Sequence, residues 1–139
     1  MKVINAGVAG DKTRDALKRA EKDVLRYNPR MVIVEFSGND FLQGIPPEET
    51  FENLDAIVDA IQKNGAMAVL VEVRAGYFGD QYISGFRKIA KKRNALLIQD
   101  ILKGILTDPS LKSDNIHPND TGYQLMADRI YKKISPLLR

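Results

Sequence analysis

The sequence contains one histidine, His117, which lies three positions after Asp114 in the stretch Ser113-Asp114-Asn115-Ile116-His117-Pro118-Asn119. A neutral imidazole is the usual general base for a hydroxyl nucleophile, and a carboxylate on its other ring nitrogen holds the required tautomer. One tight loop could aim both side chains at one point. The plainer alternative is a surface histidine beside a helix N-terminus, with Asp114 as a turn or capping residue. Short patterns of this kind often arise by chance, so the rest of the chain must decide.

Two further residues could serve the same chemistry. Acyl transfer needs hydrogen-bond donors aimed at the oxyanion that develops on the substrate. Gly10 has no side chain and precedes an expected helix, so its backbone N–H could approach a substrate oxygen. Asn39 offers a neutral amide donor. Taken singly, Gly10 could be only a turn glycine and Asn39 only an Asx-turn residue, but with Asp114 and His117 they form an ordered set that indicates an acyl-transfer site.

Composition limits the classes of protein to be considered. With 139 residues, 44% hydrophobic and 28% charged, residues 1–139 are expected to form one globular domain. The absence of cysteine excludes disulfides and thiolate metal sites, and a single histidine excludes an imidazole-rich one. We therefore expect no metal and no cofactor.

Charge and hydropathy are equally restrictive. A formal net charge of +3 is mild, and the runs Lys91-Lys92-Arg93 and Lys132-Lys133 fall in expected helices, so no nucleic-acid partner is expected. No apolar run approaches the roughly 20 residues that cross a bilayer, so no membrane span is expected. No signal peptide is visible in this chain, and the sequence leaves its location open.

Read in order, the chain alternates strands with helices. Continuous apolar runs with β-branched members are typical of strands covered on both faces, and apolar residues at helical spacing indicate helices. The expected strands cover residues 2–5, 31–36, 68–73 and 95–99; the expected helices cover residues 13–27, 47–64, about 82–90 and 120–134.

This alternation predicts an α/β fold in three layers, α/β/α, with a parallel sheet and right-handed crossovers. Ligands of such sheets bind beyond the carboxyl ends of the strands. The segments just past those ends are residues 7–11, 37–40 and 74–77, and the loop of Asp114 and His117 follows later. One rim of the sheet is therefore expected to collect all four candidate residues.

Three segments resemble blocks II, III and V of the SGNH (GDSL-like) hydrolases: Asn5-Ala-Gly-Val-Ala-Gly10-Asp11-Lys-Thr13, Val34-Glu-Phe-Ser-Gly38-Asn39-Asp40 and Asp114-Asn-Ile-His117-Pro118-Asn119. The similarity is greatest to the small bacterial thioesterase/lysophospholipase/arylesterase branch and covers essentially the whole chain. It implies a flavodoxin-like fold that hydrolyses small acyl esters or thioesters by serine acyl transfer. By position it implies oxyanion donors at Gly10 and Asn39 and the catalytic acid and base at Asp114 and His117. Arg74 and Tyr77 also resemble a segment of that branch, but we assign them no role.

Two departures from the family pattern matter. Ser37 stands where the third block usually has glycine, and block I, the Gly-Asp-Ser segment with the nucleophile, is missing from these residues. In the family that block follows the first, central strand, between the strands that correspond to residues 2–5 and 31–36. For a strand order of 2-1-3-4-5, the expected domain is N-terminally truncated and lacks its central strand. We expect this chain alone to be weakly active or inactive.

A missing central strand would leave two rows of unpaired backbone groups, which favours association. Three outcomes are open: a separate peptide or neighbouring chain fills the gap, residues 2–5 shift to pair directly with residues 31–36, or the chain swaps elements in a homodimer.

Another serine could stand in for the missing nucleophile. The sequence offers Ser37, Ser84, Ser110, Ser113 and Ser135. Only Ser37 and Ser113 lie near the expected site, and Ser37 is the better candidate because it follows a strand end beside Asn39. Its side chain is not placed by the family's own nucleophile turn, and a displacement of about 1 Å can cost on the order of a hundredfold in rate.

Two readings from other classes remain. The chain could be a non-catalytic flavodoxin-like binding or assembly module. It could also bind a nucleotide through Gly7-Val-Ala-Gly10, although the fuller fingerprint of three spaced glycines with a later acidic residue is not matched.

Overall fold

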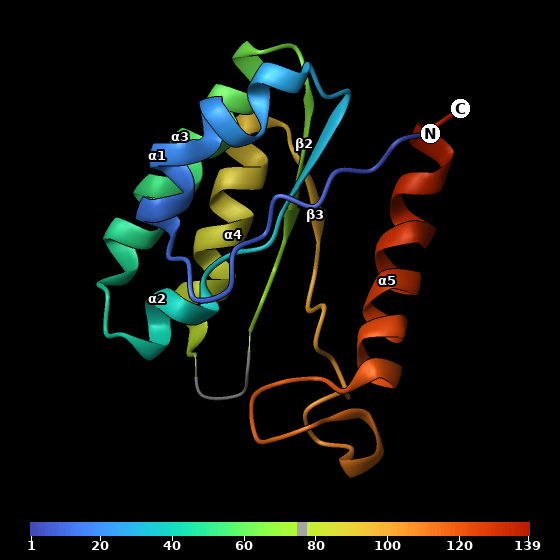
Figure 1. The fold of residues 1–139 in the computed structure, drawn as a ribbon. Coiled ribbons are helices and arrows are strands. Elements are labelled where there is room, and N and C mark those ends of the chain that lie inside the picture. Colours follow the sequence, from blue (N-terminus) through green and yellow to red (C-terminus); the bar gives the residue numbers. More distant parts are fainter. Residues whose placement is uncertain (75–77) are drawn as a thin grey trace.

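The computed structural model describes residues 1–74 and 78–139. Its centre is a three-stranded parallel sheet with the order β1-β2-β3, formed by β1 (Met31–Val34), β2 (Met67–Val71) and β3 (Leu96–Ile98). In the middle of the sheet Val69 lies between Ile33 of β1 and Leu96 of β3. Figure 1 shows this narrow, twisted sheet standing between two layers of helices.

Helices cover both faces of the sheet. One face carries α1 (Thr13–Asp23), α3 (Pro47–Lys63) and α4 (Asp80–Arg93), and the other carries α5 (Asp120–Ile134). Side chains of a strand point alternately to the two faces. In β2, Ala68 and Leu70 belong to the core under α1, α3 and α4, whereas Val69 and Val71 belong to the core under α5. All four are at most 2% exposed, which explains why β2 is an unbroken apolar run.

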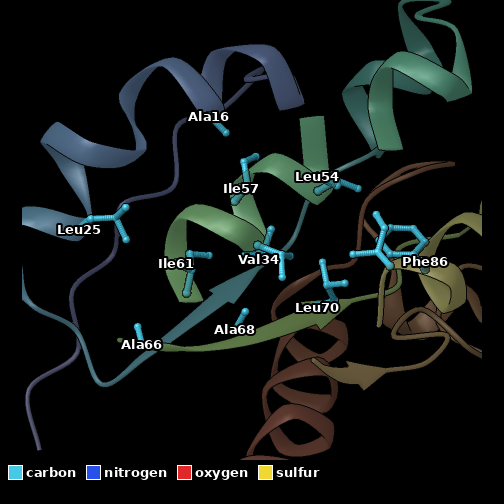
Figure 2. Packing of buried hydrophobic residues seen from close by; sticks show 12 residues of the cluster. Ala16, Leu25, Val34, Leu54, Ile57, Ile61, Ala66, Ala68, Leu70 and Phe86 are labelled. Atoms are coloured by element: carbon cyan, nitrogen blue, oxygen red, sulfur yellow. The ribbon is translucent and has the colours of Figure 1, made fainter. Parts of the chain in front are cut away.

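The core on the α3 side is drawn in Figure 2. Leu54, Ile57 and Ile61 recur at helical spacing on the buried face of α3 and pack over Val34 and Leu70 of the sheet. The expected three-layer α/β/α architecture with a parallel sheet is therefore confirmed for the described residues.

The strand expected at residues 2–5 is wrong. These residues have no strand conformation, and Val3 is 80% exposed. A strand needs a neighbour to satisfy its backbone groups, and among the described residues β1 pairs only with β2. The direct pairing of residues 2–5 with residues 31–36, one of the three expected outcomes, does not form. The Arg19 side chain donates instead to the Ala6 carbonyl at 2.7 Å and holds the end of this segment against α1.

The remaining bounds shift by a few residues. The expected strand over residues 31–36 ends at Val34, and the turn expected at residues 37–40 begins a short helix, α2 (Gly38–Leu42). The helix expected over residues 13–27 ends at Asp23 and is followed by the 3₁₀ turn η1 (Leu25–Tyr27). Two further 3₁₀ turns, η2 (Pro109–Leu111) and η3 (Ser135–Leu137), flank α5.

The carboxyl ends of the three strands lie at one end of the molecule, where α2 and the loop before α5 also lie (Figure 1). None of the helices described here combines the length and the apolar character that crossing a membrane requires.

Candidate active site

Asp114 and His117 form a closed loop. The Asp114 Oδ1 atom accepts hydrogen bonds from the N–H groups of Ile116 at 2.7 Å and His117 at 2.8 Å, and its Oδ2 atom lies 2.7 Å from His117 Nδ1. An antiparallel bridge between Lys112 and Pro118 closes the base of the loop. One carboxylate thus shapes the backbone and orients the ring. With the Nδ1 proton directed at the carboxylate, His117 Nε2 carries the lone pair that a general base needs.

The charge of Asp114 is well defined. The hydrogen bond from the Ile116 N–H, followed by the contact with His117, lowers the pKa of Asp114 from 3.8 to about 2. The carboxylate is therefore ionised throughout the pH range in which a histidine can act as a base. Both side chains are more than half exposed, so a substrate or another protein segment can reach them.

The loop is seated on the first turn of α5. Asn119 precedes that helix, its side chain accepts from the Gly122 N–H at 3.0 Å, and its amide donates to the Ser110 carbonyl at 2.9 Å. Gly122 is buried, and a Cβ atom there would lie 2.2 Å from the Leu111 carbonyl oxygen. Only glycine allows α5 to approach the loop this closely, a requirement that the sequence pattern did not reveal.

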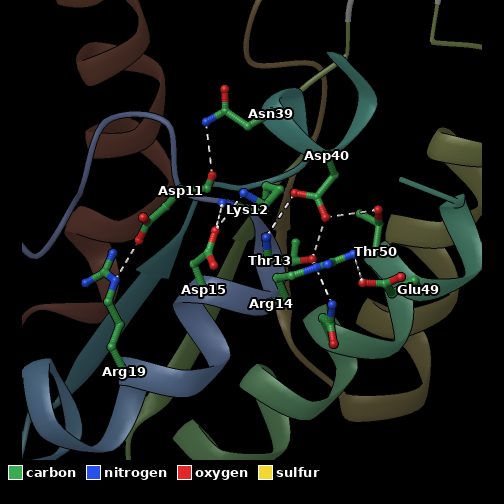
Figure 3. A network of polar contacts seen from close by, with 11 residues as sticks. Asp11, Lys12, Thr13, Arg14, Asp15, Arg19, Asn39, Asp40, Glu49 and Thr50 are labelled. Carbon is green, nitrogen blue, oxygen red and sulfur yellow. Dashed lines mark hydrogen bonds and ion pairs between the residues drawn. The ribbon is translucent and has the colours of Figure 1, made fainter. Parts of the chain in front are cut away.

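The segment with Gly10 is held on several sides (Figure 3). Asn39 donates from its Nδ2 atom to the Asp11 carbonyl at 3.0 Å, and Arg19 donates from Nε to the Asp11 carboxylate at 2.7 Å. Gly10 has a φ of +83° and forms a turn in which the Asp11 N–H donates to the Val8 carbonyl. The Gly10 N–H makes no hydrogen bond within the described part of the chain, so it is available to a ligand.

Two of the four candidate residues, Asn39 and His117, line a common groove. It has a volume of about 1080 Å³ and follows the open edge of β1. Gly10 does not line the groove, but Val8 and Asp11 from the same segment do. Glu35 also lines the groove, and partial desolvation by the surrounding protein raises the pKa of its carboxyl group above the usual 4.5.

A sequence model of the GDSL-like Lipase/Acylhydrolase family matches residues 1–125. The chain belongs to this family. It is similar to "Thioesterase 1/protease 1/lysophospholipase L1" of Escherichia coli (strain K12), with 30% identity over 142 residues that cover 98% of this chain and 68% of the relative. It is also similar to an arylesterase of Vibrio mimicus, with 26% identity over 138 residues that cover 95% and 69%.

Structural comparison agrees with the sequence comparison. The solved structure of the psychrotrophic esterase EstA from Pseudoalteromonas sp. superimposes with a TM-score of 0.86 and 31% identity, covering 97% of this chain and 77% of that one. The resemblance to SGNH hydrolases is confirmed, and the family is one of esterase- and lipase-type hydrolases. A non-catalytic binding module is not favoured.

Within this family fold, the serines near the site are engaged in the scaffold. Ser37 is 1% exposed, and its hydroxyl donates to the Val73 carbonyl at 3.2 Å. The Ser113 hydroxyl donates to the carbonyls of His117 and Pro118. Because a nucleophile must present its oxygen to both the base and the substrate, neither placement suits that role.

Other residues singled out in the sequence have structural partners. Arg74 lies between Glu72 and Asp100, with ion-pair distances of 3.0 Å to each. Tyr77 lies outside the described residues. In the described ranges, no group of three or more histidine, cysteine, aspartate or glutamate side chains is arranged to hold a metal ion.

One acidic residue of the site escaped sequence reasoning. Asp40, which was expected only to end a strand, is 1% exposed and accepts three hydrogen bonds from Thr13 and Thr50. Its position directly after Asn39 was the available signal, but partners 27 and 10 residues away are not visible in a linear pattern.

Proposed function

We propose that the chain carries the acid–base and oxyanion-binding part of a serine-type hydrolase of small acyl esters or thioesters. The observation that carries this proposal is the 2.7 Å contact between His117 Nδ1 and Asp114 Oδ2, in a loop that opens onto the same groove as Asn39. The family membership supports the reaction class, since its named relatives are thioesterases and esterases.

In the proposed reaction, a serine hydroxyl attacks the acyl carbonyl carbon while His117 Nε2 takes the hydroxyl proton. The negative charge that develops on the carbonyl oxygen is stabilised by the Gly10 N–H and the second N–H of the Asn39 amide. The intermediate collapses as the imidazolium protonates the departing alcohol or thiol. Water, deprotonated by His117, then releases the acid and restores the serine. Asp114 stays ionised and stabilises the imidazolium.

We propose that neither Ser37 nor Ser113 is the nucleophile, because both donate their hydroxyls to backbone carbonyls. We infer that a strand ending in Gly-Asp-Ser occupies the groove beside β1. The free backbone edge of β1 can pair with such a strand. Apolar side chains at the groove, Val3, Ile4 and Ile33, are 80%, 47% and 43% exposed, and a strand would cover them. It could be joined to this chain or belong to another, including a second copy in a homodimer or strand swap.

An inhibitor of a similar protein supports the acyl-transfer mechanism. The Pseudoalteromonas esterase structure is described as inhibited by monoethylphosphonate. A tetrahedral phosphonate resembles the tetrahedral oxyanion of acyl transfer, and transition-state analogues bind enzymes tightly. The same class of compound is therefore a suitable probe for this chain.

The test compares two forms of the protein, the 139-residue chain and the same chain preceded by a strand with a Gly-Asp-Ser segment. Each is assayed with a short-chain p-nitrophenyl ester and with an acyl thioester, alone and as His117→Ala and Ser37→Ala. We expect turnover only in the extended form, a loss on the order of 10³-fold or more with His117→Ala, and no loss with Ser37→Ala.

Two results would contradict the proposal. One is turnover by the 139-residue chain that Ser37→Ala abolishes, which would make Ser37 the nucleophile. The other is an extended form whose activity does not depend on His117. Size-exclusion chromatography of both forms tests the groove, since a strand supplied in cis should reduce self-association.

A further inference from the structure

The Asp40 carboxylate is the centre of a buried polar cluster (Figure 3). Its Oδ2 atom accepts from the Thr13 N–H at 2.9 Å, and its Oδ1 atom accepts from the hydroxyls of Thr13 at 2.5 Å and Thr50 at 3.2 Å. Asn53 completes the cluster by donating to Thr13 Oγ1 at 3.1 Å. Burying a carboxylate is unfavourable unless its oxygens are hydrogen-bonded. These bonds therefore strongly favour one position of Asp40 relative to Thr13.

Thr13 is the first residue of α1, where backbone N–H groups have no partner within the helix. A negative charge is favourable at this end of a helix. A local side chain already serves there, because Asp15 accepts from the Lys12 N–H at 3.0 Å. Asp40 contacts the same helix start from a distant part of the chain, so its bonds add a link between two segments rather than a cap alone.

A second contact joins the same two segments as the contact between Asp40 and Thr13. Asn39 donates to the carbonyl of Asp11, and Asp40, its neighbour, accepts from Thr13. Two consecutive residues after β1 therefore hold two residues of the segment that follows Gly10. Arg19 also holds this segment through Asp11 and the Ala6 carbonyl, but from the side of α1. The bonds of Asn39 and Asp40 are the ones that fix the segment relative to the end of β1. Thr50 extends the attachment to α3.

We propose that Asp40 is a positioning residue for the oxyanion-binding pair: it sets the location of the Gly10 N–H relative to the Asn39 amide. The inference rests on the proposed function, which assigns those two groups to the developing oxyanion. It adds that their separation is maintained by a buried carboxylate that does not itself contact the substrate. Only Asp11 and Lys12 stand between Gly10 and the residue that Asp40 holds.

The test uses the 139-residue chain itself and does not depend on catalysis. Heteronuclear NMR spectra are compared for the native chain, Asp40→Asn and the control Ile61→Ala, which removes a buried side chain at the other end of α3. In Asp40→Asn we expect clear shifts of the Gly10 backbone amide and the Asn39 side-chain amide. Hydrogen exchange should become faster at the Asn39 amide, which donates to the Asp11 carbonyl in the native chain. In Ile61→Ala the unfolding midpoint should fall while these signals stay in place.

The inference is overturned if Asp40→Asn lowers the unfolding midpoint but leaves the Gly10 and Asn39 signals where the native chain has them. If Asp40→Asn does not fold, Thr13→Val decides by the same signals, because it removes one hydroxyl donor and retains the backbone bond to Asp40.

A kinetic arm separates this inference from the proposed function. In the extended, nucleophile-bearing form, Asp40→Asn should lower kcat about a hundredfold with KM changed by less than about threefold, as expected when donors are displaced by roughly 1 Å. An unchanged kcat would overturn the inference. If the native extended form is inactive, the proposed function fails, and the NMR comparison still tests the role of Asp40 in placing the two donors.

Discussion

Replacing Gly122 by alanine should displace the loop that carries Asp114 and His117. A Cβ atom at Gly122 would lie 2.2 Å from the Leu111 carbonyl oxygen and 2.8 Å from the Pro118 Cβ, where ordinary contact begins at 3.4 Å. The obstacle is mainly backbone, which cannot rotate away as a side chain can. The loop and the first turn of α5 must therefore separate by roughly 1 Å, because close-packed interiors have no spare volume.

Two opposing effects set the size of the change in stability. Alanine is favoured over glycine in a helix by about 1 kcal/mol, whereas overpacking a close contact costs about 1–3 kcal/mol. The separation also strains the hydrogen bond from the Gly122 N–H to Asn119 Oδ1, a type of bond that contributes about 1 kcal/mol. We expect Gly122→Ala to lower the free energy of unfolding by about 1–2 kcal/mol.

Urea unfolding followed by circular dichroism measures this change, and NMR signals of the His117 ring report the position of the loop. The matched control is Gly38→Ala, because a Cβ atom at Gly38 meets nothing within 4 Å. That control should be neutral or stabilising by up to about 1 kcal/mol. If Gly122→Ala is as stable as Gly38→Ala and the His117 signals are unchanged, the packing argument for this loop is refuted.

Three further predictions concern carboxylates with shifted pKa values. Hydrogen bonds from Arg93 hold the pKa of Asp55 well below 3.8, so Asp55→Asn should lower the free energy of unfolding by about 1–2 kcal/mol at pH 7. Urea titrations should show that this difference shrinks as the pH falls below about 4 and as salt is added. Burial raises the pKa of Glu72 above 4.5, so the folded protein binds this proton more tightly than the unfolded chain. The free energy of unfolding of the native protein therefore falls as the pH rises from 4 to 7, whereas that of Glu72→Gln lacks this contribution, so the variant should gain stability relative to the native protein over this range. The carboxyl group of Asp114 should titrate by NMR with a midpoint near 2, and a midpoint near 4 would show that its loop hydrogen bonds do not persist in solution.

Some features of the fold depend on neighbours in the chain, and others depend on distant partners. The helical spacing of Leu54, Ile57 and Ile61 predicts the helix α3, and an unbroken apolar run predicts the buried strand β2. The closed loop of Asp114 and His117 also has a local cause, since the backbone N–H and the ring that the Asp114 carboxylate binds lie only three positions further along the chain. Such features depend on neighbours in the chain, which a linear pattern displays.

The tertiary structure decided the features that depend on residues far apart in the chain. Residues 2–5 are apolar enough for a strand, but a strand forms only beside another, and β1 offers them no pairing in the residues described. Ser37 follows a strand end as expected, yet its hydroxyl is buried against the Val73 carbonyl, 36 residues away.

Asp40 and Gly122 owe their importance to contacts that cross the chain, with Thr13 and with Leu111. The sequence by itself determined the order of elements, the family motifs and the acid–base loop, because these depend on short spacings. Only the tertiary structure decided which hydroxyls are buried, which strand edge stays open and which carboxylate holds the segment after Gly10. The reason is that burial and hydrogen bonding depend on which distant residues the fold places next to a group.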